Sequence, residues 1–505
     1  MDRRSILRGG AGAAALGLLP GQALAAENVR TWIDTRQQTG DLNHVWSECA
    51  GSDRAAITMR ESWRKDVDRW RSEAGLKRVR FHGIFADEMG VWAPSIQNRG
   101  KIDVPNFQNI DRVYDGLIDH GVSPLIELGF MPQKLASGSA SFGFYKGNIT
   151  PPRSVESWAD FIRQFVIHLI DRYGIATVRN WPMEVWNEPN LPFFWTGTQQ
   201  AYFDLYKATA VAIKSIDRNL QVGGPSTSAT AWLPDFAAFC GQNNAPVDFV
   251  STHCYAGDDQ AKLFGTDLHL PQADVIPEAI RRAAAQIAAS PLAGKPLWIT
   301  EWSSDSPAVI AHVIAAALPH CQMMSHWTVS STYEELGVLD FVLKEGDAGF
   351  GALTQQIAKP AFNTYALLNR LGTRRLAADG PVLASRRKDG SVSALVWNLA
   401  EVQAPSGIPG VSRTRTVTGA AKRMTVEFRG ARPGQAVLIR FVDQERGSPY
   451  PAWRAMGSPQ YPKPAQLLAL RKAAEIAAPV SMRLGTDRTV SFDLPPEGVA
   501  HLELA

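Results

Sequence analysis

The chain has 505 residues, of which 45% are hydrophobic and 20% are charged, and its formal net charge is +3. This composition is that of an ordinary globular protein and suffices for one large domain and a smaller one. The nearly neutral charge gives no electrostatic reason to expect nucleic acid or an anionic membrane surface as a partner.

The first residues of the chain have the pattern of an export signal. Arg3 and Arg4 precede a run of small and apolar residues over 9–20, and Ala-Leu-Ala at 23–25 offers a cleavage site. The arginine pair resembles a twin-arginine signal of bacteria. A short hydrophobic anchor is the alternative, but the apolar run is shorter than the ~20 residues that a bilayer span needs. We therefore expect residues 1–25 to be removed, the protein to be periplasmic or secreted, and no membrane contact to follow cleavage.

Short β-prone runs then alternate with amphipathic helical patterns eight times. Strand followed by helix, repeated eight times, predicts a (β/α)8 barrel of the TIM type, in the α/β class. The predicted strands are 44–50, 78–84, 123–130, 181–187, 220–226, 248–255, 296–302 and 322–329. The predicted helices are 61–75, 106–121, 154–173, 199–217, 232–243, 274–290, 306–319 and 353–371.

After residue 371 the pattern changes to alternating apolar and polar residues separated by turn residues, which is typical of antiparallel strands. The predicted strands are 391–399, 424–429, 436–442 and 490–494, and a helix near 464–477 interrupts them. We expect a barrel domain over 26–371 and an accessory β-sandwich over 372–505, with 26–40 as a candidate additional strand of the sandwich.

Two glutamates occupy matched positions at the ends of predicted barrel strands. Glu188 follows the fourth strand in the run EVWNEPN, and Glu301 ends the seventh in LWITEW. Barrel active sites lie at the carboxyl ends of the strands, so both carboxylates should face one cavity. Cleavage of a glycosidic bond needs two such groups, one to protonate the leaving oxygen and one to attack the sugar carbon or activate water. Glutamates placed there by chance are the alternative, and the agreement of both with the barrel pattern argues against it.

Polar and aromatic residues mark other predicted strand ends. Aromatic faces beside carboxylates and amides suit a sugar, which has apolar C–H faces and hydroxyl edges. For the histidines and Glu127 the alternative is a hydrogen-bonded core residue. These candidates are His82, Glu127, Asn187, His253, Tyr255 and Trp327.

The four cysteines lie far apart in the sequence and have no CxxC spacing. This pattern indicates neither a zinc site nor a disulfide framework, and we expect buried thiols. No metal or other cofactor is expected, because carboxylates alone suffice for glycosidic cleavage. The cysteines are Cys49, Cys240, Cys254 and Cys321.

Short stretches spread over most of the chain after residue 25 match one known family. They are 46–52, 81–87, 127–132, 145–152, 184–190, 222–225, 247–251, 299–301, 326–328 and 333–335 in the barrel, with 386–391 and 396–399 beyond it. On these residues the chain resembles glycoside hydrolase family 39. The best-known members of that family are bacterial β-xylosidases, with α-L-iduronidases as more distant relatives.

The resemblance implies a retaining, exo-acting β-xylosidase that cleaves short xylooligosaccharides. We also expect a monomer, because only a few residues follow the last predicted strand and could bind a neighbouring subunit. It makes Glu188 the general acid/base and Glu301 the nucleophile, with their carboxyl groups about 5 Å apart. It also implies that Asn187 holds the sugar 2-hydroxyl. The subsite for the non-reducing sugar would be lined by His82, His253, Tyr255, Trp327 and Glu334 or Glu335. The alternatives are a glycosidase of this family with an arabinose-containing, uronic or exopolysaccharide substrate, and a carbohydrate-binding barrel without activity.

Overall fold

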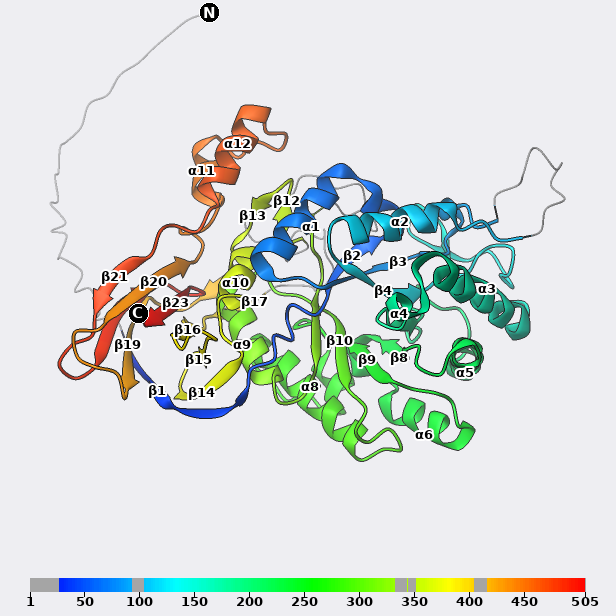
Figure 1. Ribbon diagram of the computed structural model, residues 1–505, viewed down its shortest axis with the longest axis horizontal. Coiled ribbons are helices and arrows are strands. Elements are labelled where there is room, and N and C mark those ends of the chain that lie inside the picture. Colours follow the sequence, from blue (N-terminus) through cyan, green and yellow to red (C-terminus); the bar gives the residue numbers. More distant parts are fainter. Residues whose placement is uncertain (1–26, 93–103, 332–342, 344–350, 404–415, 505) are drawn as a thin grey trace, which may run out of the picture.

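The computed structural model shows a barrel of alternating strands and helices beside a region built mainly of strands (Figure 1). The structure describes residues 27–92, 104–331, 343, 351–403 and 416–504. Over these ranges, no helix combines the length and apolarity needed to cross a bilayer.

Eight parallel strands close into a barrel, which confirms the predicted fold class. Around the barrel the order is β10-β11-β2-β3-β4-β7-β8-β9. The strands are β2 (Ala50–Arg54), β3 (Arg78–His82), β4 (Ser123–Leu128), β7 (Met183–Val185), β8 (Val222–Thr227), β9 (Phe249–His253), β10 (Leu297–Trp302) and β11 (Met323–His326).

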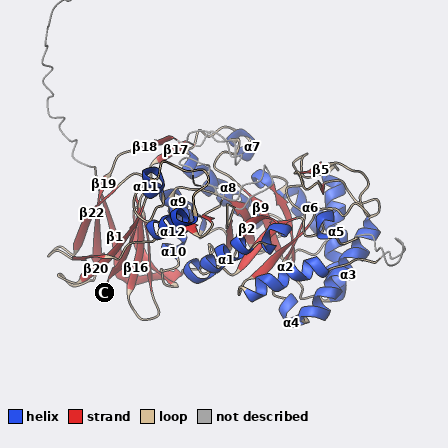
Figure 2. Cartoon of the chain, turned by 90° about the horizontal axis from the view of Figure 1, so that it is seen from above, coloured by secondary structure: helices blue, strands red, loops and turns tan. Residues whose placement is uncertain are grey.

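Helices surround the barrel (Figure 2). Side chains of Ser154, Thr198 and Ser306 accept hydrogen bonds from backbone N–H groups in the first turns of α3, α5 and α9, which explains where these helices begin. The barrel helices are α1 (Glu61–Ala74), α2 (Gln108–Asp119), α3 (Val155–Tyr173), α5 (Gln199–Ile216), α6 (Leu233–Asn243), α8 (Gln272–Ala288), α9 (Pro307–Ala317) and α10 (Pro360–Leu368). Shorter helices are α4 (Ile175–Val178) and α7 (Gln260–Phe264).

Two elements of the barrel lie several residues away from their predicted positions. The first barrel strand runs over Ala50–Arg54, not 44–50, and residues 45–47 form a turn. Its residues are small or polar and have no β-prone pattern. Small residues are needed here because the ring of Trp327 fills the adjacent space. A Cβ atom at Gly51 would lie only 2.3 Å from Cε3 of Trp327. The last helix begins at Pro360, because the short strands β12 (Leu353–Thr354) and β13 (Ile357–Ala358) form a hairpin before it.

The accessory β region is one continuous sheet of nine strands, in the order β21-β20-β23-β16-β15-β14-β1-β19-β22. The amino-terminal strand β1 pairs antiparallel with β14 and parallel with β19. The strands are β1 (Asn28–Asp41), β14 (Arg374–Asp379), β15 (Val382–Arg386), β16 (Val392–Trp397), β19 (Lys422–Arg429), β20 (Ala436–Val442), β21 (Val480–Arg483), β22 (Thr489–Leu494) and β23 (Val499–Leu504).

This sheet has a core of its own and also packs on the barrel. Phe428, Ile439 and Leu502 belong to a buried cluster formed within the sheet, whereas Leu395 and Trp397 join the large cluster of the barrel. Between β20 and β21, the helices α11 (Tyr450–Ala455) and α12 (Pro464–Ala473) project at the top of Figure 1. The strands β17 (Glu401–Gln403) and β18 (Thr416–Thr418) form a separate ladder, as do β5 (Ser141–Phe142) and β6 (Gly147–Asn148) on the barrel.

Candidate active site

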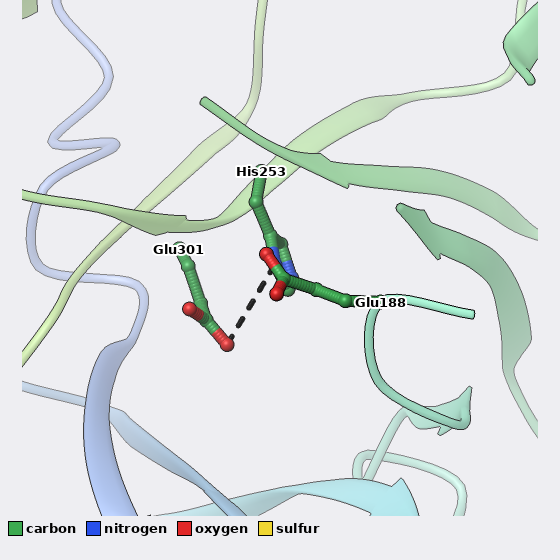
Figure 3. A group of neighbouring side chains, drawn as sticks. All are labelled: Glu188, His253 and Glu301. Atoms are coloured by element: carbon green, nitrogen blue, oxygen red, sulfur yellow. Dashed lines mark hydrogen bonds and ion pairs between the residues drawn. The ribbon is translucent and has the colours of Figure 1, made fainter. Parts of the chain in front are cut away.

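Glu188 and Glu301 lie together at the carboxyl end of the barrel, pointing toward each other and toward His253 (Figure 3). One carboxylate oxygen of each glutamate and a ring nitrogen of His253 all lie within 4.8 Å of one another. Both glutamates are largely buried, with 7% and 5% of their surface exposed. A spacing of about 5 Å leaves no room for a water molecule between the two carboxylates and a sugar, and it is the spacing of glycosidases that form a covalent intermediate.

Glu188 is held by its backbone. Its φ angle of 41° lies in the left-handed region, and its N–H donates to the carbonyl of Ser226 over 2.8 Å. A non-glycine residue keeps such a conformation only where its surroundings determine it. The strained turn after β7 therefore fixes the direction in which the carboxyl group points.

The carboxyl group of Glu188 is suited to carry a proton near neutral pH. Burial raises its pKa to about 7, although a hydrogen bond from Ser228 acts in the opposite direction. Nδ1 of His253 lies 2.9 Å from Oε1 of Glu188. Burial lowers the pKa of His253 to about 4, so this histidine is neutral when Glu188 titrates.

Glu301, by contrast, is surrounded by hydrogen-bond donors. Arg80 donates from Nη1 to Oε1 over 2.6 Å, and the hydroxyl of Tyr255 donates to Oε2 over 2.8 Å. Both contacts stabilise the negative charge and orient the carboxylate. The site thus places Glu188 opposite a carboxyl group that two donors hold, and cleavage of a glycosidic bond needs two carboxyl groups in such different environments.

Arg80 is the central cation of the site, and sequence reasoning missed it. It is completely buried in β3, and it also donates from Nε to Oε2 of Glu184 over 2.6 Å and lies 3.0 Å from Oε2 of Glu127. Burial alone would raise the pKa of Glu184, but the charge of Arg80 and the hydrogen bonds from Arg80 and Ser251 act with His253 to lower it. Alternation along β3 could have revealed this arginine, because residues 80 and 82 of one strand face the same side and His82 was already a candidate.

His82 and Glu127 form a buried pair beside Glu301. Nδ1 of His82 lies 2.6 Å from Oε2 of Glu127, and its Nε2 lies 3.8 Å from Oε1 of Glu301. Burial lowers the pKa of His82 to about 4 and raises that of Glu127 to about 8, against the effect of Arg80. His82 thus lies between two glutamates: its Nδ1 contacts Glu127, and its Nε2 faces Glu301.

The other candidates surround the same point. The ring of Trp327 lies 4.8 Å from that of His82, and the side-chain oxygen of Asn187 accepts from Nη2 of Arg80 over 2.9 Å. Nδ2 of Asn187 is buried and has no hydrogen-bond partner among the described residues. The structure thus brings together His82, Asn187, His253, Tyr255 and Trp327 around the two glutamates, whereas Glu334 and Glu335 lie outside the described residues.

The two glutamates and His253 also have the spacing of metal ligands. Within the described ranges, Glu188, His253 and Glu301 form the group whose ligand atoms are close enough to hold a metal ion. One oxygen of Glu301 already accepts from the cation Arg80, which would oppose a second cation at that place. The four cysteines are buried and free.

The chain is similar to known proteins over most of its length. The sequence model of glycosyl hydrolases family 39 matches residues 29–488. The chain is 34% identical to a β-xylosidase of Caldicellulosiruptor saccharolyticus over 92% of this chain and 95% of the relative. It is likewise 34% identical to a β-xylosidase of Geobacillus stearothermophilus over 91% of this chain and 90% of the relative. The crystal structure of a monomeric β-xylosidase from Caulobacter crescentus CB15 superposes with a TM-score of 0.82, at 33% identity, over 94% of this chain and 99% of that one.

Proposed function

The chain belongs to glycosyl hydrolases family 39, and we propose that it is a retaining, exo-acting β-xylosidase that releases xylose from the non-reducing ends of xylooligosaccharides. The observation that carries the proposal is the pair Glu188 and Glu301. Their carboxylate oxygens lie within 4.8 Å of each other, and burial raises the pKa of Glu188 to about 7.

In the first step, a carboxylate oxygen of Glu301 attacks C1 of the terminal xylose. Glu188 gives its proton to the glycosidic oxygen, the bond from C1 to that oxygen breaks, and the shortened oligosaccharide leaves as an alcohol. The xylose is then an ester of Glu301. Arg80 and Tyr255 hold the attacking carboxylate in place and balance its charge before the reaction.

In the second step, Glu188 acts as a base. Formation of the ester removes the negative charge of Glu301, so the proton of Glu188 is lost more easily than in the free enzyme. The carboxylate of Glu188 takes a proton from water, the water oxygen attacks C1, and the bond from C1 to Glu301 breaks. Two inversions return the xylose with its original β configuration.

Xylose as the substrate sugar is supported by the names of two relatives that are each 34% identical over at least 90% of their length. A uronic sugar would require a cation available to its carboxylate. Among the described residues near the site, Arg80 already binds Glu127, Glu184 and Glu301, and Arg54 binds Glu88 over 2.8 Å. A barrel that only binds carbohydrate is disfavoured because both glutamates are present and correctly spaced.

A panel of nitrophenyl glycosides tests the proposal. We expect the β-xyloside to exceed the β-glucoside, α-arabinosides and uronides in kcat/KM by at least about tenfold. Proton NMR of early product should show β-xylose, which then mutarotates. A preference for an arabinoside or uronide would assign the site to that sugar, α-xylose as the first product would exclude retention, and binding without cleavage would identify a binding barrel.

We also propose that the chain is exported by the signal predicted at residues 1–25 and acts as a monomer. The monomeric β-xylosidase of Caulobacter crescentus, of similar fold, supports the second part. Light scattering of the purified protein should give a molar mass near the 55.2 kDa of one chain, reduced by the mass of the removed signal peptide. A dimer mass would contradict it.

A further inference from the structure

Asp258 closes a tight turn that follows the strand β9. Its Oδ2 accepts a hydrogen bond from the N–H of Tyr255 over 2.8 Å, and its own N–H donates to the carbonyl of Tyr255 over 3.1 Å. One residue therefore binds both polar groups of the Tyr255 backbone. An aspartate that bonds to nearby backbone in this way fixes the direction in which the chain leaves the strand.

The turn begins where the pairing of the barrel strands ends. The strand β9 pairs with β10 as far as His253, which lies opposite Glu301. The N–H of Cys254 still donates to the carbonyl of Glu301, over 3.3 Å. Tyr255 is the next residue, and its N–H binds Asp258 instead of a strand. The contact with Asp258 thus replaces strand pairing at Tyr255.

The side chain of Tyr255 contacts the proposed nucleophile. Its hydroxyl donates to Oε2 of Glu301 over 2.8 Å, and it lies at the far end of a rigid ring. A small rotation of the Tyr255 backbone would therefore move the hydroxyl out of hydrogen-bond distance. Misplacement of a catalytic group by about 1 Å can lower the rate by about a hundredfold. The orientation of Glu301 thus depends on the turn that Asp258 closes.

The carboxyl group of Asp258 is unfavourably placed for stability. Burial raises its pKa to about 7, and the negative charge of Glu188 acts in the same direction, against the hydrogen bond from Tyr255. Within the part of the chain that the structure describes, no Lys, Arg or His forms an ion pair with Asp258. A carboxyl group shielded from water without a cation costs free energy of folding, and such groups are concentrated at functional sites.

We propose that Asp258 is a positioning residue for the reaction, which directs the hydroxyl of Tyr255 at Glu301 by binding the tyrosine backbone. The inference rests on the proposed function, in which Glu301 is the nucleophile. The adjacent Asp259 provides a matched control, because its Oδ1 accepts from the N–H of Lys262 over 3.2 Å and caps the helix α7 instead.

A double-mutant cycle tests the proposal on a dinitrophenyl β-xyloside. Its leaving group needs no proton, so kcat/KM reports the attack by Glu301. Tyr255→Phe removes the hydroxyl and should lower kcat/KM by about 10- to 100-fold. Asp258→Ala should lower it by about 5- to 50-fold, because the hydroxyl is present but misdirected. In the Tyr255→Phe background the same change should cost less than about twofold, since no hydroxyl remains to be directed.

Conservative variants separate positioning from general damage to the fold. Asp258→Asn keeps an oxygen that accepts the N–H of Tyr255 and should stay within about threefold of wild type. The control Asp259→Ala should leave kcat/KM within about twofold in both backgrounds. Circular dichroism establishes that each variant is folded. If Asp258→Ala does not fold, Asp258→Ser takes its place in the cycle, because a serine hydroxyl makes the same contact more weakly.

Two outcomes would overturn the proposal. One is an equal loss from Asp258→Ala with and without the tyrosine hydroxyl, and the other is an Asp258→Asn variant as impaired as Asp258→Ala. The wild-type protein tests the proposed function separately. If it cleaves another glycoside but no β-xyloside, the proposed sugar is wrong, and the cycle is then measured on the glycoside that is cleaved, so the two failures are distinguishable.

Discussion

Arg80 donates a hydrogen bond from Nη1 to Oε1 of Glu301 over 2.6 Å in a part of the barrel where the arginine has no exposed surface. The same guanidinium contacts Glu127 and Glu184. One buried cation thus serves three carboxylates, and it couples the stability of the barrel to the position of the attacking group.

Replacement of Arg80 by Met should destabilise the protein strongly. The buried carboxylates lose their cation, and the free energy of unfolding should fall by about 3–5 kcal/mol in urea titrations. Without the arginine, the buried carboxylates bind protons more tightly than in the unfolded chain, so the loss should be smaller at pH 5 than at pH 7. The control Arg78→Met, on the same strand but paired with the half-buried Glu48 over 2.9 Å, should cost less than about 1 kcal/mol. Equal losses in the two variants would contradict this role.

Glu301→Gln should abolish turnover on every glycoside, by at least about a thousandfold, because no group remains to form the ester with xylose. Glu61→Gln is a suitable control, since Glu61 is a largely exposed glutamate on α1 that pairs with Lys65. Activity of the Glu301 variant within tenfold of wild type would exclude it as the nucleophile.

Glu188→Ala should separate the two steps. A dinitrophenyl β-xyloside needs no proton to release its leaving group, so the first step should survive while xylobiose is barely cleaved. The xylosyl enzyme then accumulates, and kcat and KM should fall together.

Added azide tests the second step in the same Glu188→Ala variant. It attacks without a base, so it should restore turnover and yield β-xylosyl azide, identified by NMR. Formation of the α-azide would indicate direct displacement, and the roles of Glu188 and Glu301 would have to be exchanged or abandoned.

The pH profile should report the titration of Glu188. Burial raises the pKa of this group to about 7, and the protonated form is the active one. The kcat/KM for xylobiose should therefore fall as the pH rises through about 7. In Glu188→Ala acting on the dinitrophenyl xyloside, this basic limb should disappear. If the fall in activity at basic pH persists in the variant, it reports the titration of a group other than Glu188.

Export can be tested by Arg3→Lys combined with Arg4→Lys, at positions outside the described residues. A twin-arginine route requires both arginines, so the protein should remain folded and active in the cytoplasm of a bacterial host. Cell fractionation with a β-xyloside assay measures this, with Arg8→Lys as the control. Delivery to the periplasm that is unaffected by the double change would point to the general secretion route or to an anchor.

Much of the architecture was predictable because it is encoded locally. The strand predicted at 296–302 is observed as β10 over Leu297–Trp302, and the helix predicted at 154–173 is α3 over Val155–Tyr173. Periodicity and capping act over a few residues, so a single sequence shows them. The position of β2 was predicted wrongly because its small residues are determined by a distant contact. Gly51 packs against Trp327, which lies far away in the chain.

The sequence by itself also marked Glu188 and Glu301 as candidate catalytic residues, because a strand end in a barrel is defined by its own neighbours. Only the tertiary structure decided what each glutamate can do. The burial that raises the pKa of Glu188 and the donors that hold Glu301 come from other strands, with Arg80 from β3 and Tyr255 from beyond β9. Such contacts depend on closure of the barrel, which brings distant residues within a few ångströms and excludes water. The same closure places the hairpin of Phe142 beside the loop of Phe193, a pairing that no local pattern predicts.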